Sequence, residues 1–174
     1  MGSPGDLERN PGRRLIFRPS RIADIHHVAA NIRPADREEI RAATGAPPLK
    51  ELGIGYTESR PCLTAADSET DEAVVMFGVV PTSAEEFPRF GVIWLIATTD
   101  IVHYTTQFLR ESKPRLAEVC RGYTIVGNLI DDRNALHALW LRWLGFSLIK
   151  KHPEHGVEKR PFTEFVKIVE DPNV

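Results

Sequence analysis

Residues 94–101 combine an apolar run with polar residues in a way that could hold a ligand. The run ends at Ala97 and is followed by Thr98, Thr99 and Asp100, residue types that commonly begin helices. A strand end that is not paired exposes backbone groups that can hydrogen-bond an extended ligand arm. The start of the next helix offers free N–H groups and a positive dipole end to a pyrophosphate. The sequence therefore predicts a binding site built from Trp94, Ile96, Ala97, Thr98, Thr99, Asp100 and Ile101.

Residues 128–146 supply a second set of polar candidates. Asn128 lies near the end of an apolar run, and Asn134 lies on the first turn of an amphipathic helix. We expect both amides to face the same ligand from its other side. Tyr104, His103 and His137 are the candidate proton carriers. The alternative for Tyr104 is a place in a helix core, and for His103 and His137 the role of ordinary surface or satisfied histidines.

Composition limits the class of protein. The 174 residues are 42% hydrophobic and 26% charged, as expected for one globular domain, which we assign to residues 13–174 behind a flexible arm of residues 1–12. A net charge of -2 at pH 7 gives no argument for binding nucleic acid. No apolar run could span a membrane, no cysteine has metal-binding spacing, and free thiols favour the cytoplasm. The N-terminal arginines are either solvated or a dock for an acidic protein partner: Arg9, Arg13, Arg14, Arg18 and Arg21.

Short apolar runs predict the strands that must position these residues. The clearest are residues 73–80, 90–97 and 123–130. The first two should form an antiparallel hairpin, whereas a helix between the last two should make them parallel. Weaker strands are expected at residues 14–18, 60–65, 146–149 and 162–169, with a charged loop at 150–160.

Helices are expected on both faces of this sheet. The predicted helices are 25–32 capped by Asp24, 34–44 ended by Gly45, 49–59, 101–120 kinked or divided at Pro114, and one that Asp131 or Asp132 caps and Gly145 ends. Together these elements predict a three-layer α/β sandwich around a mixed α+β sheet.

This order of elements resembles the GNAT superfamily, the Gcn5-related N-acetyltransferases. The last helix in that family typically shows an Asn, a Tyr seven residues later and a Gly-Phe four residues after that. Asn134, Leu141 and Gly145-Phe146 occupy these positions here. The resemblance implies a splayed sheet, acetyl-CoA between the strands that end at Ala97 and Asn128, and an amine acceptor, protein or small molecule, that attacks the thioester directly. It also implies that the backbone amides of Ile96 and Ala97 polarise the thioester carbonyl.

The chain departs from the family pattern at two places. GNAT enzymes usually carry a Gly-rich Gln/Arg-x-x-Gly-x-Gly/Ala turn after the central strand, whereas residues 98–103 contain no glycine and include Asp100. Leu141 replaces the Tyr that often protonates the leaving thiolate. A general base often lies near the central strands in this family, where residues 58–72 hold an acidic cluster that also fits a solvated turn. These departures keep open a catalytically degenerate structural or interaction protein.

A narrower resemblance is carried by residues 93–101 (IWLIATTDI), by Asn128 and Asn134, and by residues 140–146 (WLRWLGF). These segments are similar to the GNAT-like proteins of short-tailed bacteriophages, including their small internal virion protein. The similarity implies a phage-encoded acetyltransferase-like protein in the cytoplasm of a bacterial host. The alternative is that the protein is an internal component of the virion.

Overall fold

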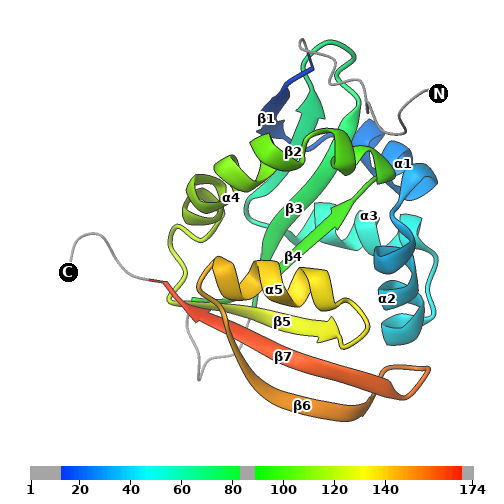
Figure 1. The fold of residues 1–174 in the computed structure, drawn as a ribbon, viewed down its shortest axis with the longest axis vertical. Coiled ribbons are helices and arrows are strands. Elements are labelled where there is room, and N and C mark those ends of the chain that lie inside the picture. The colour runs from blue at the N-terminus through cyan, green and yellow to red at the C-terminus, as the bar shows by residue number, and fades with distance from the viewer. Residues whose placement is uncertain (1–12, 83–88, 170–174) are drawn as a thin grey trace, which may run out of the picture.

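A seven-stranded mixed sheet forms the centre of the molecule in a computed structural model that describes residues 13–82 and 89–169 (Figure 1). The strand order is β1-β2-β3-β4-β5-β7-β6. β3 and β4 form the expected antiparallel hairpin, and β4 and β5 are parallel, also as expected. The strands are β1 Leu15–Pro19, β2 Cys62–Asp67, β3 Ala73–Pro81, β4 Phe90–Ala97, β5 Ile125–Asp131, β6 Ser147–His155 and β7 Arg160–Ile168.

The charged segment predicted as a loop at 150–160 is largely strand, so that prediction is wrong. β6 continues to His155 and pairs with β7 at the edge of the sheet. An edge strand with exposed faces needs few apolar residues, and lysines on an edge discourage pairing with other chains. The apolar alternation that identifies a strand in a sequence is therefore missing here.

Within the described residues, six helical segments connect the strands: α1 Ile22–Asn31, α2 Pro34–Thr44, α3 Pro48–Glu58, the 3-10 helix η1 Thr99–His103, α4 Thr105–Val119 and α5 Ala135–Trp143. Gly45 ends α2 at a positive φ of 69°, as expected. Asp24 is not the cap of α1 but lies in its first turn, where its carboxylate accepts the Arg21 N–H at 2.8 Å. Asn134, rather than Asp131 or Asp132, precedes α5.

The predicted division of the fourth helix occurs at Tyr104 and not at Pro114. η1 ends before Tyr104, and α4 then runs through Pro114 without a break. Arg110 and Pro114 are both exposed, so water can satisfy the carbonyl that loses its helical donor. A proline on the solvent side is for this reason tolerated inside α4.

The helices cover both faces of the sheet (Figure 1). α1 and α3 pack on one face through Val28 and Leu52, with Met76 of β3 beneath them. α4 and α5 pack on the other face through Val119, Leu141 and Leu144. No helix among residues 13–82 and 89–169 is both long and apolar enough to cross a membrane. The predicted three-layer arrangement is confirmed.

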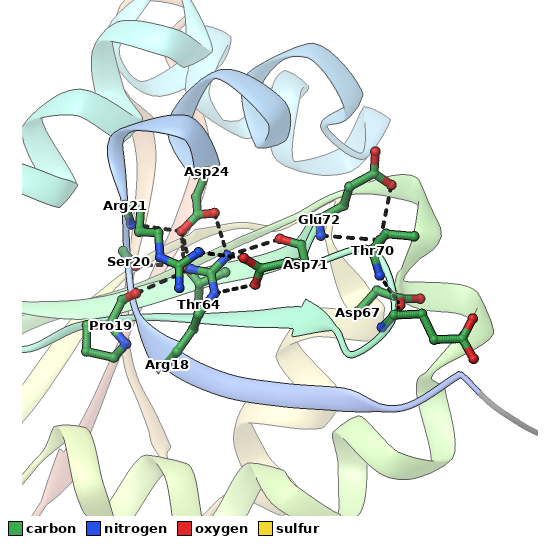
Figure 2. A network of polar contacts seen from close by, with 11 residues as sticks. Arg18, Pro19, Ser20, Arg21, Asp24, Thr64, Asp67, Thr70, Asp71 and Glu72 are labelled. Carbon is green, nitrogen blue, oxygen red and sulfur yellow. Dashed lines mark hydrogen bonds and ion pairs between the residues drawn. The ribbon is translucent and has the colours of Figure 1, made fainter.

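An ion-pair network centred on the buried Asp24 joins β1, α1 and the β2–β3 turn (Figure 2). Arg18 donates to both carboxylate oxygens of Asp24 at 2.8 and 2.9 Å and to Asp71 at 2.7 Å. Thr64 of β2 also donates to Asp24, at 2.9 Å. Burial alone would raise the pKa of Asp24, but the hydrogen bonds from Arg18, Arg21 and Thr64 lower it below its ordinary value. The carboxylate therefore stays ionised and holds α1 against the sheet.

Three of the five N-terminal arginines are engaged within the fold. Arg13 pairs with Asp67 at 3.6 Å, and Arg18 and Arg21 both pair with Asp71. Residues 1–12, which include Arg9, lie outside the described residues. Most of the described arginines in the predicted binding surface for an acidic partner are thus already paired with carboxylates of the fold.

Candidate functional site

β4 and β5 separate part-way along their length. They pair from Phe90↔Ile125 to Val92↔Gly127 and no further, whereas β4 stays paired with β3 as far as Ala97. The edge of β4 that faces β5 is consequently not paired with β5 beyond residue 92. The splayed sheet expected from the resemblance is present.

The ladder between β3 and β4 decides which backbone groups face this gap. The Thr98 N–H donates to the Val74 carbonyl at 2.8 Å. Hydrogen-bonded pairs alternate along an antiparallel ladder, so Ile96 directs its N–H and C=O toward β3, and Leu95 directs its own into the gap. The expectation that the Ile96 amide polarises a bound carbonyl is therefore wrong, because a one-residue shift along a strand reverses the direction of these groups.

Asn128 forms the apex of the gap. Its Nδ2 donates to the Ile93 carbonyl at 2.9 Å, and its Oδ1 accepts the Leu129 N–H at 2.8 Å. The side-chain amide is inserted where the next direct bond between the strands would form. Asn128 therefore satisfies the backbone at the point where the strands part.

A cavity of about 410 Å³ fills the splay and reaches both helical layers. Ligand pockets typically measure about 300–1,000 Å³, so this volume suits a small molecule or an extended ligand arm. Residues 92–96 of β4 are all half-buried, although helices cover both faces of this central strand. Among the predicted site residues, the binding candidates Trp94, Ile96 and Asn128 and the catalytic candidate His137 line the cavity.

Trp94 is held against α3, at the wall of the cavity. Its Nε1 donates to Ser59 Oγ at 2.8 Å. The indole lies so close to Gly55 that a Cβ there would be 2.7 Å from the ring. The glycine at this position of α3 therefore makes room for the tryptophan.

Ala97 has its amide engaged by a carboxylate. The Ala97 N–H donates to Asp36 Oδ2 at 2.9 Å, and the Ala97 carbonyl accepts the Arg33 N–H at 2.9 Å. Asp36 is itself held by the Arg33 guanidinium at 2.6 and 3.0 Å. The expected polarising role of the Ala97 amide is thus also wrong, because this N–H already donates its hydrogen bond to Asp36. The contact instead fixes the start of α2 at the open end of the gap.

Glu39, Asn134 and His137 meet across the gap from opposite sides of the sheet. Asn134 Nδ2 lies 3.3 Å from Glu39 Oε2 and 3.5 Å from His137 Nδ1. Burial raises the pKa of Glu39 to about 7 against the hydrogen bond from Asn134, and the charge of Asp36 adds to the rise. Burial lowers the pKa of His137 to about 4. At neutral pH the cluster therefore holds a neutral imidazole and a carboxyl group poised to exchange a proton.

The remaining predicted residues lie away from the cavity lining. Thr98 is fully buried against Val74, and residues 99–103 fold into η1, with the Ile101 N–H donating to the Thr98 carbonyl at 3.3 Å. Thr99 and Asp100 thus belong to a 3-10 helix. Tyr104 is buried, and its hydroxyl donates to Asp67. Burial and this carboxylate raise the pKa of Tyr104. Among the described residues no group of His, Cys, Asp and Glu side chains is arranged to hold a metal ion.

The same architecture occurs in solved acetyltransferase structures. The protein yncA of Salmonella typhimurium, a proposed acetyltransferase solved with its cofactor acetyl-CoA, is 15% identical, with 91% of this chain and 95% of that chain covered and a TM-score of 0.66. Spermidine N-acetyltransferase from Vibrio cholerae, in complex with CoA and spermine, is 12% identical over 89% of this chain and 95% of that one, with a TM-score of 0.64. The phosphinothricin acetyltransferase of Sinorhizobium meliloti is a GNAT superfamily protein in complex with acetyl-CoA. It is 16% identical over 89% of this chain and 88% of that one, with a TM-score of 0.63. The chain has the GNAT fold.

The likeness to GNAT structures is one of fold. At these identities the sequence itself carries little of the similarity, and no family model and no curated protein sequence matches the chain. The chemistry of the site has to be argued from this chain's own residues.

Sequence reasoning missed the acidic residues of the cavity. Asp36, Glu39 and Glu51 all line it, but Asp36 and Glu39 read as ordinary acidic residues in the first turns of a helix. A signal was present, because their spacing of three residues places both on one face of α2. The acidic cluster at 58–72 serves other purposes: Asp67 binds Tyr104, and Asp71 binds Arg18 and Arg21.

Proposed function

We propose that the chain is an acyltransferase that moves an acetyl group from acetyl-CoA to an amine. The observation that carries this proposal is the open edge of β4 at Leu95, beside a cavity of about 410 Å³. The Leu95 N–H and C=O can hydrogen-bond the extended arm of a thioester as a further strand would. The GNAT-fold structures with acetyl-CoA or CoA bound support this placement.

Glu39 is the proposed general base. The reacting amine enters from the α2–α3 side, and Glu39 accepts a proton from its ammonium form. The free amine then attacks the thioester carbonyl carbon, so that a C–N bond forms and the C–S bond breaks, with the electron pair leaving on sulfur. The proton that the nitrogen loses after the attack passes to this sulfur, and the products are the amide and the free thiol of CoA. Asn134, which bonds Glu39 at 3.3 Å, orients the carboxyl group and serves as a positioning residue. His137 is neutral and contributes to the wall beside them.

Binding of acetyl-CoA tests the proposal directly. We expect acetyl-CoA to raise the melting temperature of the protein and to give binding heat in calorimetry. Leu129→Trp should fill the gap, because Leu129 lines the cavity just beyond Asn128. Leu136→Trp is the matched control, since Leu136 is 75% exposed on α5. If neither the wild type nor the Leu136→Trp control shows a thermal shift or binding heat with acetyl-CoA, the acyl-CoA site is rejected.

The second candidate function is a binding or structural protein that has lost catalysis. The observation that favours it is η1, where a 3-10 helix that contains Asp100 stands in the position of a Gly-rich pyrophosphate loop. Phage origin, location in the host cytoplasm or in a virion, and a protein partner at the N-terminal arm stay predictions. Detection of acetylated amine after incubation with acetyl-CoA, lost in Glu39→Gln, would reject the degenerate alternative.

A further inference from the structure

The charges around the cavity are distributed unevenly. Its acidic lining residues are Asp36 and Glu39 of α2 and Glu51 of α3, all on one helical layer. Arg115 of α4 is the one Lys or Arg side chain that lines the cavity within the described residues, and it belongs to the opposite layer. Arg115 is already paired with Glu118 at 2.6 Å and Glu111 at 3.6 Å.

Two of the three carboxylates have no cationic partner among the residues that the structure describes. Asp36 is neutralised by Arg33. Within residues 13–82 and 89–169, neither Glu39 nor Glu51 forms an ion pair, and Glu51 makes no side-chain hydrogen bond. A half-buried carboxylate that lacks a partner is costly in a largely apolar wall, because water is partly excluded from it. Ile40, Ile54 and Ile96 are among the apolar residues that line the same cavity.

We propose that the acceptor is a linear aliphatic amine that carries a second positive charge, such as an α,ω-diamine. This inference rests on the proposed function. The reacting nitrogen lies at Glu39, the distal ammonium lies at Glu51, and the isoleucines contact the methylene chain. An amine with a carboxylate or phosphate in place of the distal ammonium is disfavoured, because Glu51 repels it and no unpaired Lys or Arg of the described lining can receive it.

The test compares three amines of equal length by calorimetry: 1,4-diaminobutane, 1-aminobutane and 4-aminobutanoate. We expect the diamine to bind at least about tenfold more tightly than 1-aminobutane, and 4-aminobutanoate more weakly than either, since one partly desolvated ion pair is worth about that factor. Glu51→Gln should reduce the ratio between diamine and monoamine to about 2. Glu58→Gln is the control, because Glu58 is exposed at the end of the same helix and does not line the cavity.

The outcomes separate this inference from the function on which it rests. Equal affinity for diamine and monoamine, or an unchanged ratio in Glu51→Gln, overturns the diamine acceptor even if acetyl-CoA binds. A diamine preference that Glu51→Gln abolishes supports the cationic subsite whether or not acetyl-CoA binds. Circular dichroism of both variants confirms that each remains folded.

Discussion

At the scale of single residues, the site depends on groups whose surroundings change their proton affinity. Glu39 and His137 lie on either side of Asn134, and burial disfavours the charged form of both. Burial therefore raises the pKa of the acid and lowers the pKa of the base. The same position of Glu39 that suits proton transfer near neutral pH also affects the stability of the folded state.

Glu39 should make the protein less stable as pH rises. Its pKa increases from 4.5 to about 7 on folding, so between these values the folded state binds more protons than the unfolded state. The free energy of unfolding then falls with rising pH across that interval. We expect Glu39→Gln, which cannot titrate, to gain stability relative to the wild type between pH 5 and pH 8 in urea denaturation.

His137 provides a comparison of opposite sign. Its pKa falls from 6.5 to about 4 on folding, so its contribution is complete above pH 6.5 and is lost as pH falls toward 4. His137→Gln should therefore compare more favourably with the wild type at pH 5 than at pH 8. A Glu39→Gln variant with the same pH dependence as the wild type would contradict the raised pKa of Glu39.

At the scale of elements, the termini of the helices set the geometry of the site. Gly145 follows α5 with a φ of 89°, a conformation that L side chains rarely adopt. The turn that it allows leads the chain from α5 into β6 and keeps the Asn134 end of α5 at the gap. The number of residues between Asn134 and Gly145-Phe146 therefore corresponds to the length of α5 and its terminal turn.

Alanine substitution at two glycines should have opposite effects. Gly145→Ala should destabilise the protein by about 1–2 kcal/mol, because a Cβ at positive φ is strained. Gly53→Ala, inside α3, should be neutral or stabilise by up to about 1 kcal/mol, since a Cβ there meets nothing within 4 Å and alanine favours helix. Thermal denaturation of both variants measures the difference; a stable Gly145→Ala protein would rule out the strained turn.

At the scale of the whole molecule, the gap requires that its two sides be fixed independently. β4 is held by β3, and β5 is held by β7 along its whole length. The α1 layer is held in turn by the Asp24 network, which joins segments up to 53 residues apart (Figure 2). Because each side has its own supports, the strands can part without unfolding.

Removing Asp24 should destabilise the molecule far more than removing a neighbouring surface charge. Asp24→Asn removes the buried carboxylate that accepts two hydrogen bonds from Arg18 and leaves Arg18 only the more exposed Asp71, so we expect a loss of roughly 3 kcal/mol in the free energy of unfolding. Arg21→Gln breaks the exposed pair with Asp71 and should cost less than about 1 kcal/mol. Urea denaturation at neutral pH distinguishes the two, and equal losses would show that the Asp24 network is not a principal support.

The sequence by itself determined the buried strands, the helix that links β4 to β5 and the Gly145 stop. These features arise from local apolar periodicity and from backbone preference, which a short window of residues contains. The edge strand β6 escaped prediction, since an exposed edge leaves no apolar pattern. The fold class followed from the order of the elements.

Only the tertiary structure decided which groups meet at the site. The direction of the Leu95 and Ile96 backbone groups depends on the register with β3, and the capture of the Ala97 amide by Asp36 depends on where α2 packs. Glu39 meets Asn134 across 95 residues of chain, and its raised pKa exists only because both helical layers exclude water there. Long-range register and burial are properties of the assembled sheet, so the spacing of residues along the chain does not contain them.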